Sequence, residues 1–147
     1  MYTDIQTVEL TRPYFVDAYR QEPSAQVFSL GPVDARIAEL ADGCRKLLDL
    51  PENWNSYRSK RVDENLLGDG IRLLSLLLSP RVRTPDVVPT ARGGVQLEWH
   101  APHQDLEIEV RGLGHYRVFH RRLDAEKEVD VFDDISTLLP LVRDFPA

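Results

Sequence analysis

The sequence has few of the residues on which several classes of protein depend. It holds one cysteine, Cys44, in 147 residues, so neither an internal disulfide nor a cluster of thiolates around zinc can form within one chain. The longest apolar run, Leu73 to Leu78, is interrupted by Ser75 and falls short of the roughly 20 residues that a membrane-spanning helix needs. The first ten residues include Asp4 and Glu9 and do not have the basic start of a secretory signal. We therefore expect a cytoplasmic protein that does not enter a membrane.

Positive charge is also scarce, with 18 Lys and Arg against 24 Asp and Glu and a formal net charge of -6. Binding to nucleic acid depends on clustered positive charge, so the composition argues against nucleic acid as the main partner, although a local basic patch would still allow it. Neither G-x-S-x-G nor H-E-x-x-H is present, and Gly93-Gly94 lacks the Lys-Ser/Thr that follows in a phosphate-binding loop. The sequence therefore supports no catalytic set and predicts no cofactor.

The length and the 42% of hydrophobic residues are typical of a single domain with one core. The order of patterns predicts an α+β fold in four parts. These are an N-terminal arm at 1–30, a helical pair at 31–80, a β-meander at 81–132 and a C-terminal helix at 133–147. The helices are expected on one face of the sheet, with the other face in water.

Apolar residues at three- and four-residue spacing predict two amphipathic helices, at 34–50 and 63–79. Each is followed directly by a proline, Pro51 or Pro80. Asp34 is expected to cap the first helix, and Asp63 is expected to cap the second by accepting hydrogen bonds from the amides two and three residues on. Gly70 and a second glycine two residues before it weaken the second helix by about 1 kcal/mol each relative to alanine. Such glycines indicate a close approach by another backbone or an irregular first turn.

Strict alternation of apolar and polar residues after Pro85 predicts an antiparallel meander of four or five strands. A final helix is expected from Asp133 or Asp134, with Pro140 kinking it or delaying its start. The predicted strands are 86–90, 95–100, 105–111, 116–121 and 128–132.

The segment between the two helices is a candidate binding loop. Trp54, Asn55 and Tyr57 combine aromatic rings with a hydrogen-bonding side chain, and Arg58 opens a run of cations that continues to Arg61. Such a loop can stack a base or hold a phosphate, which would make the chain a nucleic-acid binder through Trp54 to Arg61. In the alternative interpretation, Trp54 and Tyr57 form a hydrophobic lid on the helix pair while Asn55 and Ser56 satisfy the loop backbone.

A second candidate site lies on the polar side of the predicted strands. Glu98 and His100 share one face of a strand, and Glu107 and Glu109 are offered by the next strand. A metal site with Glu98, His100 and Glu107 as ligands is one interpretation, and it would make the chain a metal-dependent hydrolase or nuclease. The other interpretation is a solvated face on which the glutamates at 98, 107 and 109 pair across strands with Arg111, Arg117 and Arg121.

Three motifs between residues 53 and 110 carry a family resemblance. They are Trp54-Asn55-Ser56-Tyr57, Gly93-Gly94-Val95-Gln96-Leu97-Glu98-Trp99 and Leu106-Glu107-Ile108-Glu109. With them the chain resembles a group of small, uncharacterised bacterial proteins that share W-[DN]-x-Y, G-G-[VI]-x-L-E-W and L-E-[IV]-E. The resemblance implies a bacterial or phage-borne origin, and it implies no activity. The resemblance favours a contact role for the acidic residues that fall within its motifs.

The leading functional prediction is a non-catalytic protein-protein interaction module, a subunit or neutraliser in a bacterial or phage accessory or defence system. The partner is expected to be a protein encoded nearby, with a second copy of the chain as an alternative. The expected contact residues are Trp54, Asn55, Tyr57, Arg58, Glu98, His100, Glu107, Glu109 and Arg117.

Overall fold

The computed structural model describes residues 35–146. Two helices, a five-stranded antiparallel sheet and a last helix follow one another along the chain, which confirms the predicted α+β fold. The arm predicted at 1–30 and the cap predicted at Asp34 lie outside the described residues. The elements are α2 (Arg36–Leu47), α3 (Glu64–Leu77), β1 (Asp86–Pro89), β2 (Val95–Ala101), β3 (Gln104–Gly112), β4 (His115–Arg122), β5 (Ala125–Phe132) and α4 (Ile135–Arg143).

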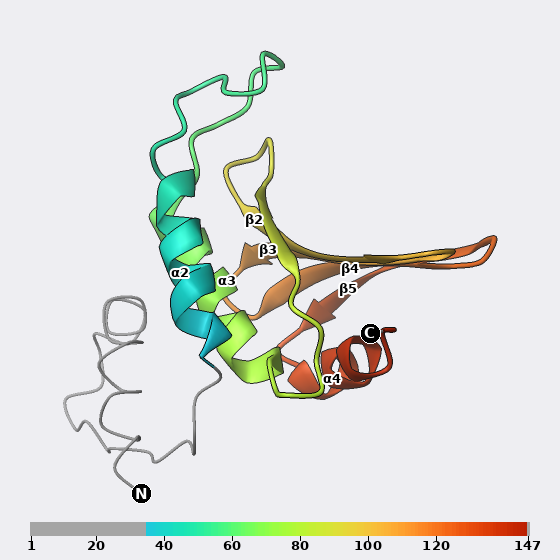
Figure 1. The fold of residues 1–147 in the computed structure, drawn as a ribbon. Helices are drawn as coiled ribbons and strands as arrows, with labels where there is room; N and C mark the ends of the chain where they lie inside the picture. The colour runs from blue at the N-terminus through green and yellow to red at the C-terminus, as the bar shows by residue number, and fades with distance from the viewer. Residues whose placement is uncertain (1–34, 147) are drawn as a thin grey trace, which may run out of the picture.

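The strands form a simple meander in which each pairs with its neighbour in the sequence, in the order β1-β2-β3-β4-β5. Helix α3 packs against β2 and β3, and α2 packs on α3 and β1 (Figure 1). The strand β5 begins at Ala125, three residues before the predicted start, because it pairs along its whole length with β4. In β5 only Val131 is buried, so this strand is a largely exposed edge.

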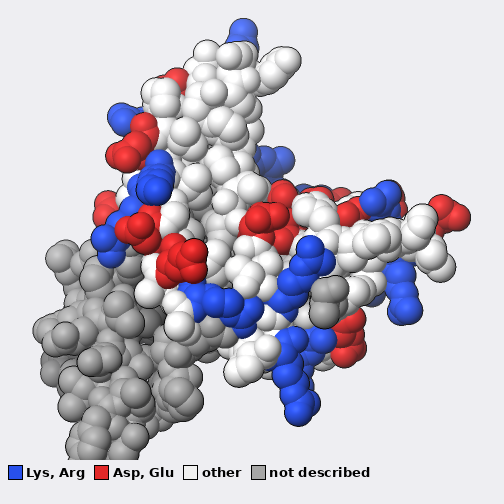
Figure 2. Space-filling model, in the orientation of Figure 1, with Lys and Arg blue, Asp and Glu red and all other residues white. Residues whose placement is uncertain are grey.

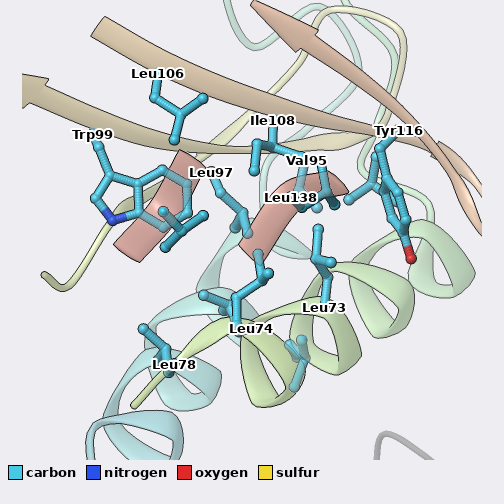
Figure 3. Close-up of a cluster of buried hydrophobic side chains, with 14 of the residues drawn as sticks. Leu73, Leu74, Leu78, Val95, Leu97, Trp99, Leu106, Ile108, Tyr116 and Leu138 are labelled. Carbon is cyan, nitrogen blue, oxygen red and sulfur yellow. The ribbon is translucent and has the colours of Figure 1, made fainter. Parts of the chain in front are cut away.

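One hydrophobic cluster joins the inner face of the sheet to the helices. Leu73 and Leu74 of α3 point toward the sheet, and Leu138 of α4 lies among the same inner-face side chains (Figure 3). Burying a side chain of this size contributes about 1.5–3 kcal/mol, so this interior holds the two layers together. The buried inner-face residues of β2, β3 and β4 are Val95, Leu97, Trp99, Leu106, Ile108, Val110, Tyr116 and Val118.

The N-terminal aspartates of α3 and α4 accept hydrogen bonds from different groups. The Asp63 carboxylate accepts hydrogen bonds from the amides of Asn65 at 2.8 Å and Leu66 at 3.1 Å, as predicted. Asp134 occupies the cap position of α4, and its carboxylate accepts from the hydroxyls of Ser136 and Thr137 while making no cap bond to an amide. The helix starts directly after this residue, so the proline inside it does not delay its start.

The connection between α3 and β1 is fixed to both layers. The Arg36 guanidinium of α2 donates to the carbonyls of Val82 at 2.6 Å and Ser79 at 2.7 Å. The indole N–H of Trp99, in β2, donates to the carbonyl of Arg83 at 2.7 Å. Backbone carbonyls in an irregular segment lack the regular partners of a helix or strand. These side-chain donors supply hydrogen bonds to the carbonyls of residues 79, 82 and 83.

Gly70 lies where α3 approaches the sheet closely. A Cβ added at this glycine would lie 2.7 Å from Cγ2 of Val95, a side chain with no exposed surface. The sequence predicted a close approach by another backbone, whereas the atoms nearest to a Cβ at Gly70 belong to side chains. The predicted ends of the helices were less accurate, since α2 ends at Leu47 and not at residue 50.

We expect alanine at the two helical glycines, Gly70 and Gly43, to have opposite effects. Gly70→Ala gains helix propensity but forces Val95 to move in a packed core, so the free energy of unfolding should fall by about 1 kcal/mol. Gly43→Ala, with nothing within 4 Å of its new Cβ, should raise it by up to about 1 kcal/mol. Urea denaturation of the two variants beside the wild type measures both changes. A stabilising Gly70→Ala would show that α3 does not sit as close to β2 as described.

Candidate interaction surface

The outer face of the sheet brings most of the predicted site residues together. Glu98 lies directly opposite Glu107 in the register of β2 and β3, and Gln96 lies opposite Glu109. Arg117 of β4 continues the second of these rows beside Glu109. These side chains alternate with the buried set, so the meander and its register place them on one surface.

Glu98 and Glu107 share a single neutral donor. Nε2 of Gln96 donates to Oε1 of Glu98 at 2.8 Å and to Oε2 of Glu107 at 3.0 Å. Burial and the neighbouring charge of Glu98 raise the pKa of Glu107, and the Gln96 hydrogen bond offsets part of that rise. Burial likewise raises the pKa of Glu109, against the opposing effect of nearby arginines. The partly buried carboxyl of Glu107 thus has a neutral amide as its hydrogen-bond donor and a like charge directly opposite it.

His100 lies between two carboxylates. Its Nε2 is 3.1 Å from Oε2 of Glu98, and its Nδ1 is 2.8 Å from Oδ1 of Asp105. Asp105 also accepts a hydrogen bond from Nε of Arg121 at 2.7 Å. The bonds to Asp105 and Glu98 raise the pKa of His100, and the bond from His100 lowers the pKa of Asp105. Both ring nitrogens are thus already occupied by protein oxygens.

The glutamates were predicted to pair with arginines across strands. Glu109 does have an arginine partner, with 3.0 Å between its Oε2 and a guanidinium nitrogen of Arg111, but the two residues lie on the same strand. Arg121 pairs with Asp105, and Arg117 donates to Glu128 of β5 at 2.5 Å. Within residues 35–146, neither Glu98 nor Glu107 has an arginine partner. In the same range, no group of three or more His, Cys, Asp or Glu side chains is placed to hold a metal ion.

The β5 side of the surface contains residues that the sequence analysis did not select. Nε2 of His115 lies 2.9 Å from Oδ1 of Asp130, and the same ring stacks on Phe132 with 4.3 Å between centroids. Phe132 is nonetheless 64% exposed. The sequence offered one signal for this cluster, the position of Phe132 at a strand end, but its contact with His115 depends on the register of β4 and β5.

The loop between α2 and α3 extends away from the helix pair (Figure 1). Its backbone is held by its own side chains. Oδ1 of Asn55 accepts from the amide of Tyr57 at 2.8 Å and from that of Ser59 at 3.3 Å. Oδ1 of Asn53 accepts from the amide of Arg58 at 2.7 Å. The predicted role of Asn55 in satisfying the loop backbone is therefore confirmed.

The predicted hydrophobic lid is wrong for Tyr57, which is 85% exposed at the apex of the loop. Trp54 is half-buried, and its indole N–H donates to the carbonyl of Lys60 at 3.2 Å, inside the loop itself. The buried serine of the loop is Ser59 and not Ser56, and its hydroxyl accepts from the amide of Asn55 at 3.3 Å. Three non-glycine residues with positive φ shape this backbone, which sequence patterns do not reveal.

The stem of the loop lies beside the turn between β1 and β2. The amide of Lys60 donates to the carbonyl of Ala91 at 2.9 Å, and the amide of Asp63 donates to that of Gly93 at 2.7 Å. A cap of α3 and the loop are thereby attached to the sheet. The stem of the loop is therefore joined to the turn that opens β2, a connection that two separate sequence motifs did not establish.

We expect Glu107→Gln to stabilise the protein at neutral pH. The pKa of Glu107 is raised on folding, so the folded state binds the proton more tightly than the unfolded state does. The free energy of unfolding therefore falls as the pH rises and the carboxyl ionises. The amide removes this loss and the repulsion from Glu98. The gain should be about 0.5–1 kcal/mol near pH 7, on the scale of cross-strand charge pairs, and it should disappear well below the ordinary Glu value of 4.5.

Urea denaturation of the variant across this pH range measures the effect. Glu126→Gln, an exposed carboxylate of β5, is the control and should change stability little. Equal or lower stability of Glu107→Gln at neutral pH would contradict the electrostatic account of the pair.

No family model, curated protein or solved structure matches this chain. The resemblance to small bacterial proteins therefore stays a prediction from the motifs. Among the helices between residues 35 and 146, none has the length and apolar character that crossing a membrane requires.

Proposed function

We propose that this chain is a protein-protein interaction module that contacts its partner through the outer face of the sheet. The observation that carries the proposal is the direct opposition of Glu98 and Glu107 on that face, with one glutamine as their shared donor. Like charges directly opposite one another in a sheet lower the stability of the isolated protein. A cationic group of a partner would offset that repulsion, so part of the free energy that the repulsion costs the folded protein would favour binding.

The chemistry of the face favours binding over catalysis. His100 is occupied at both ring nitrogens, and Asp105 is paired with Arg121. These groups therefore hold one another in place beside the acid pair. The alternative of a metal-dependent hydrolase, with Glu98, His100 and Glu107 as ligands, has no supporting observation in residues 35–146. A role as subunit or neutraliser in an accessory or defence system is part of the proposal and rests on the resemblance alone.

The test is co-expression of the chain with the genes beside its own, followed by native mass spectrometry of what co-purifies. Glu98→Lys is the informative variant, because the new cation can pair with Glu107 and keep the fold while it reverses the charge offered to a partner. Glu39→Lys makes the same charge change at an exposed position on α2 and is the control.

The expected result is a stoichiometric complex that the wild type and Glu39→Lys form and that Glu98→Lys weakens by at least about tenfold. A chain that purifies alone would count against an interaction module. A complex that is indifferent to Glu98→Lys would show that the outer face is not the contact surface.

A further inference from the structure

The apex of the loop and the adjoining turn present an exposed aromatic ring and several cations. Tyr57 is 85% exposed, and no hydrogen bond or ion pair joins its side chain to any described residue. The cations around it are exposed and equally free of ion pairs within residues 35–146. Figure 2 shows basic and uncharged atoms at the outermost end of this loop. The cations of the loop and of the adjoining turn are Arg58, Lys60, Arg61 and Arg92.

The backbone amides under these side chains are hydrogen-bonded. Every amide from residue 55 to residue 61 has an acceptor within the loop or in the neighbouring turn. Asn53, Ser56 and Arg58 have φ of 60°, 64° and 62°, which costs energy for residues other than glycine. These hydrogen bonds fix the backbone from which Tyr57 and the cations project. Such preorganisation lowers the entropy lost when a partner binds.

We propose that this loop binds an acidic segment of the partner protein, an inference that rests on the function proposed above. Tyrosine and arginine are the residues that most often dominate the energy of protein interfaces. The loop presents positive charge, whereas Glu98 and Glu107 on the sheet present negative charge. A partner that covers both must carry an acidic segment opposite the loop and a basic one opposite the sheet.

The same observations disfavour nucleic acid at this loop. Single-stranded binding relies on several rings that stack successive bases, and only Tyr57 is free to do so because Trp54 is half-buried with its N–H bonded to the loop. A nucleic acid also carries one sign of charge and cannot complement a cationic loop beside an acidic sheet.

The loop can be tested without the partner, by titrating poly-L-glutamate or an oligothymidylate of equal charge into the isotope-labelled protein at low salt. Amide chemical shifts are followed by NMR. We expect poly-L-glutamate to shift the amides of residues 55–61 and those of the turn around Arg92, and to bind more tightly than the oligothymidylate. The double variant Arg58→Glu/Lys60→Glu should weaken this binding about tenfold.

Arg81→Glu/Arg122→Glu makes the same change of charge at two exposed positions away from the loop, and it should leave the loop shifts unchanged. Near-UV circular dichroism of both double variants checks that the core is intact. The proposal is overturned if the glutamate polymer leaves the loop amides unshifted, if both double variants lose binding alike, or if the oligothymidylate binds more tightly. Any of these outcomes leaves the co-purification result, and with it the proposed function, untouched.

Discussion

Trp99→Ala should lower the free energy of unfolding by about 4–5 kcal/mol, a loss that few single substitutions reach. Trp99 is 1% exposed and lies on the inner face of β2, against the hydrophobic cluster under the sheet (Figure 3). Truncation leaves a cavity, which accounts for about 3–5 kcal/mol at a buried aromatic residue. It also removes the indole donor from the carbonyl of Arg83. Urea denaturation followed by circular dichroism measures the loss.

Trp99→Phe separates the two contributions. It retains most of the apolar volume and loses the hydrogen bond to Arg83, so it should cost about 2 kcal/mol. Domains of this size are stable by about 5–15 kcal/mol, so the alanine variant is expected to be near the limit of folding and the phenylalanine variant well within it. If the two variants were equally stable, the cavity would not cause most of the loss in the alanine variant, and the described packing of Trp99 would be in error.

The elements of the fold were predictable where local sequence alone decides them. Val95, Leu97 and Trp99 alternate with polar residues, and only an extended strand places all three on one buried face. Asp63 is followed by amides that its carboxylate reaches without help from the rest of the protein. The end of α2 was placed too late, because its last residues form tight turns that use the same residue types as a helix.

The candidate surface was only partly predictable, because its contacts depend on register and on left-handed backbone. The pairing of His100 with Asp105 follows from their positions opposite one another in β2 and β3. A shift of one residue would have placed the two side chains on different faces. The apex of the loop depends on positive φ at Ser56 and Arg58, residue types that rarely adopt it. A lid was therefore the simpler expectation for Tyr57.

Gly93→Ala should lower the free energy of unfolding by about 2–3 kcal/mol and detach the loop from the sheet. Gly93 has φ of +89°, and a Cβ at this position would lie 2.7 Å from the carbonyl oxygen of Arg61, a backbone atom that cannot rotate away. Its own carbonyl accepts from the amide of Asp63 at 2.7 Å. Any shift that relieves the clash therefore disturbs both the stem of the loop and the residue that caps α3.

Gly112→Ala is the matched control, since nothing lies within 4 Å of its added Cβ, and its stability should stay close to that of the wild type. Thermal unfolding of the two variants measures the difference, expected as a melting temperature lower by roughly 8 °C for Gly93→Ala. Hydrogen exchange at the amides of residues 58–61 adds a local readout, because loss of the stem should accelerate exchange there more than in the β-sheet. If Gly93→Ala matched the control in both measurements, the loop would not depend on the β1–β2 turn. The proposed preorganisation of the loop backbone under Tyr57 would then lose its attachment to the sheet.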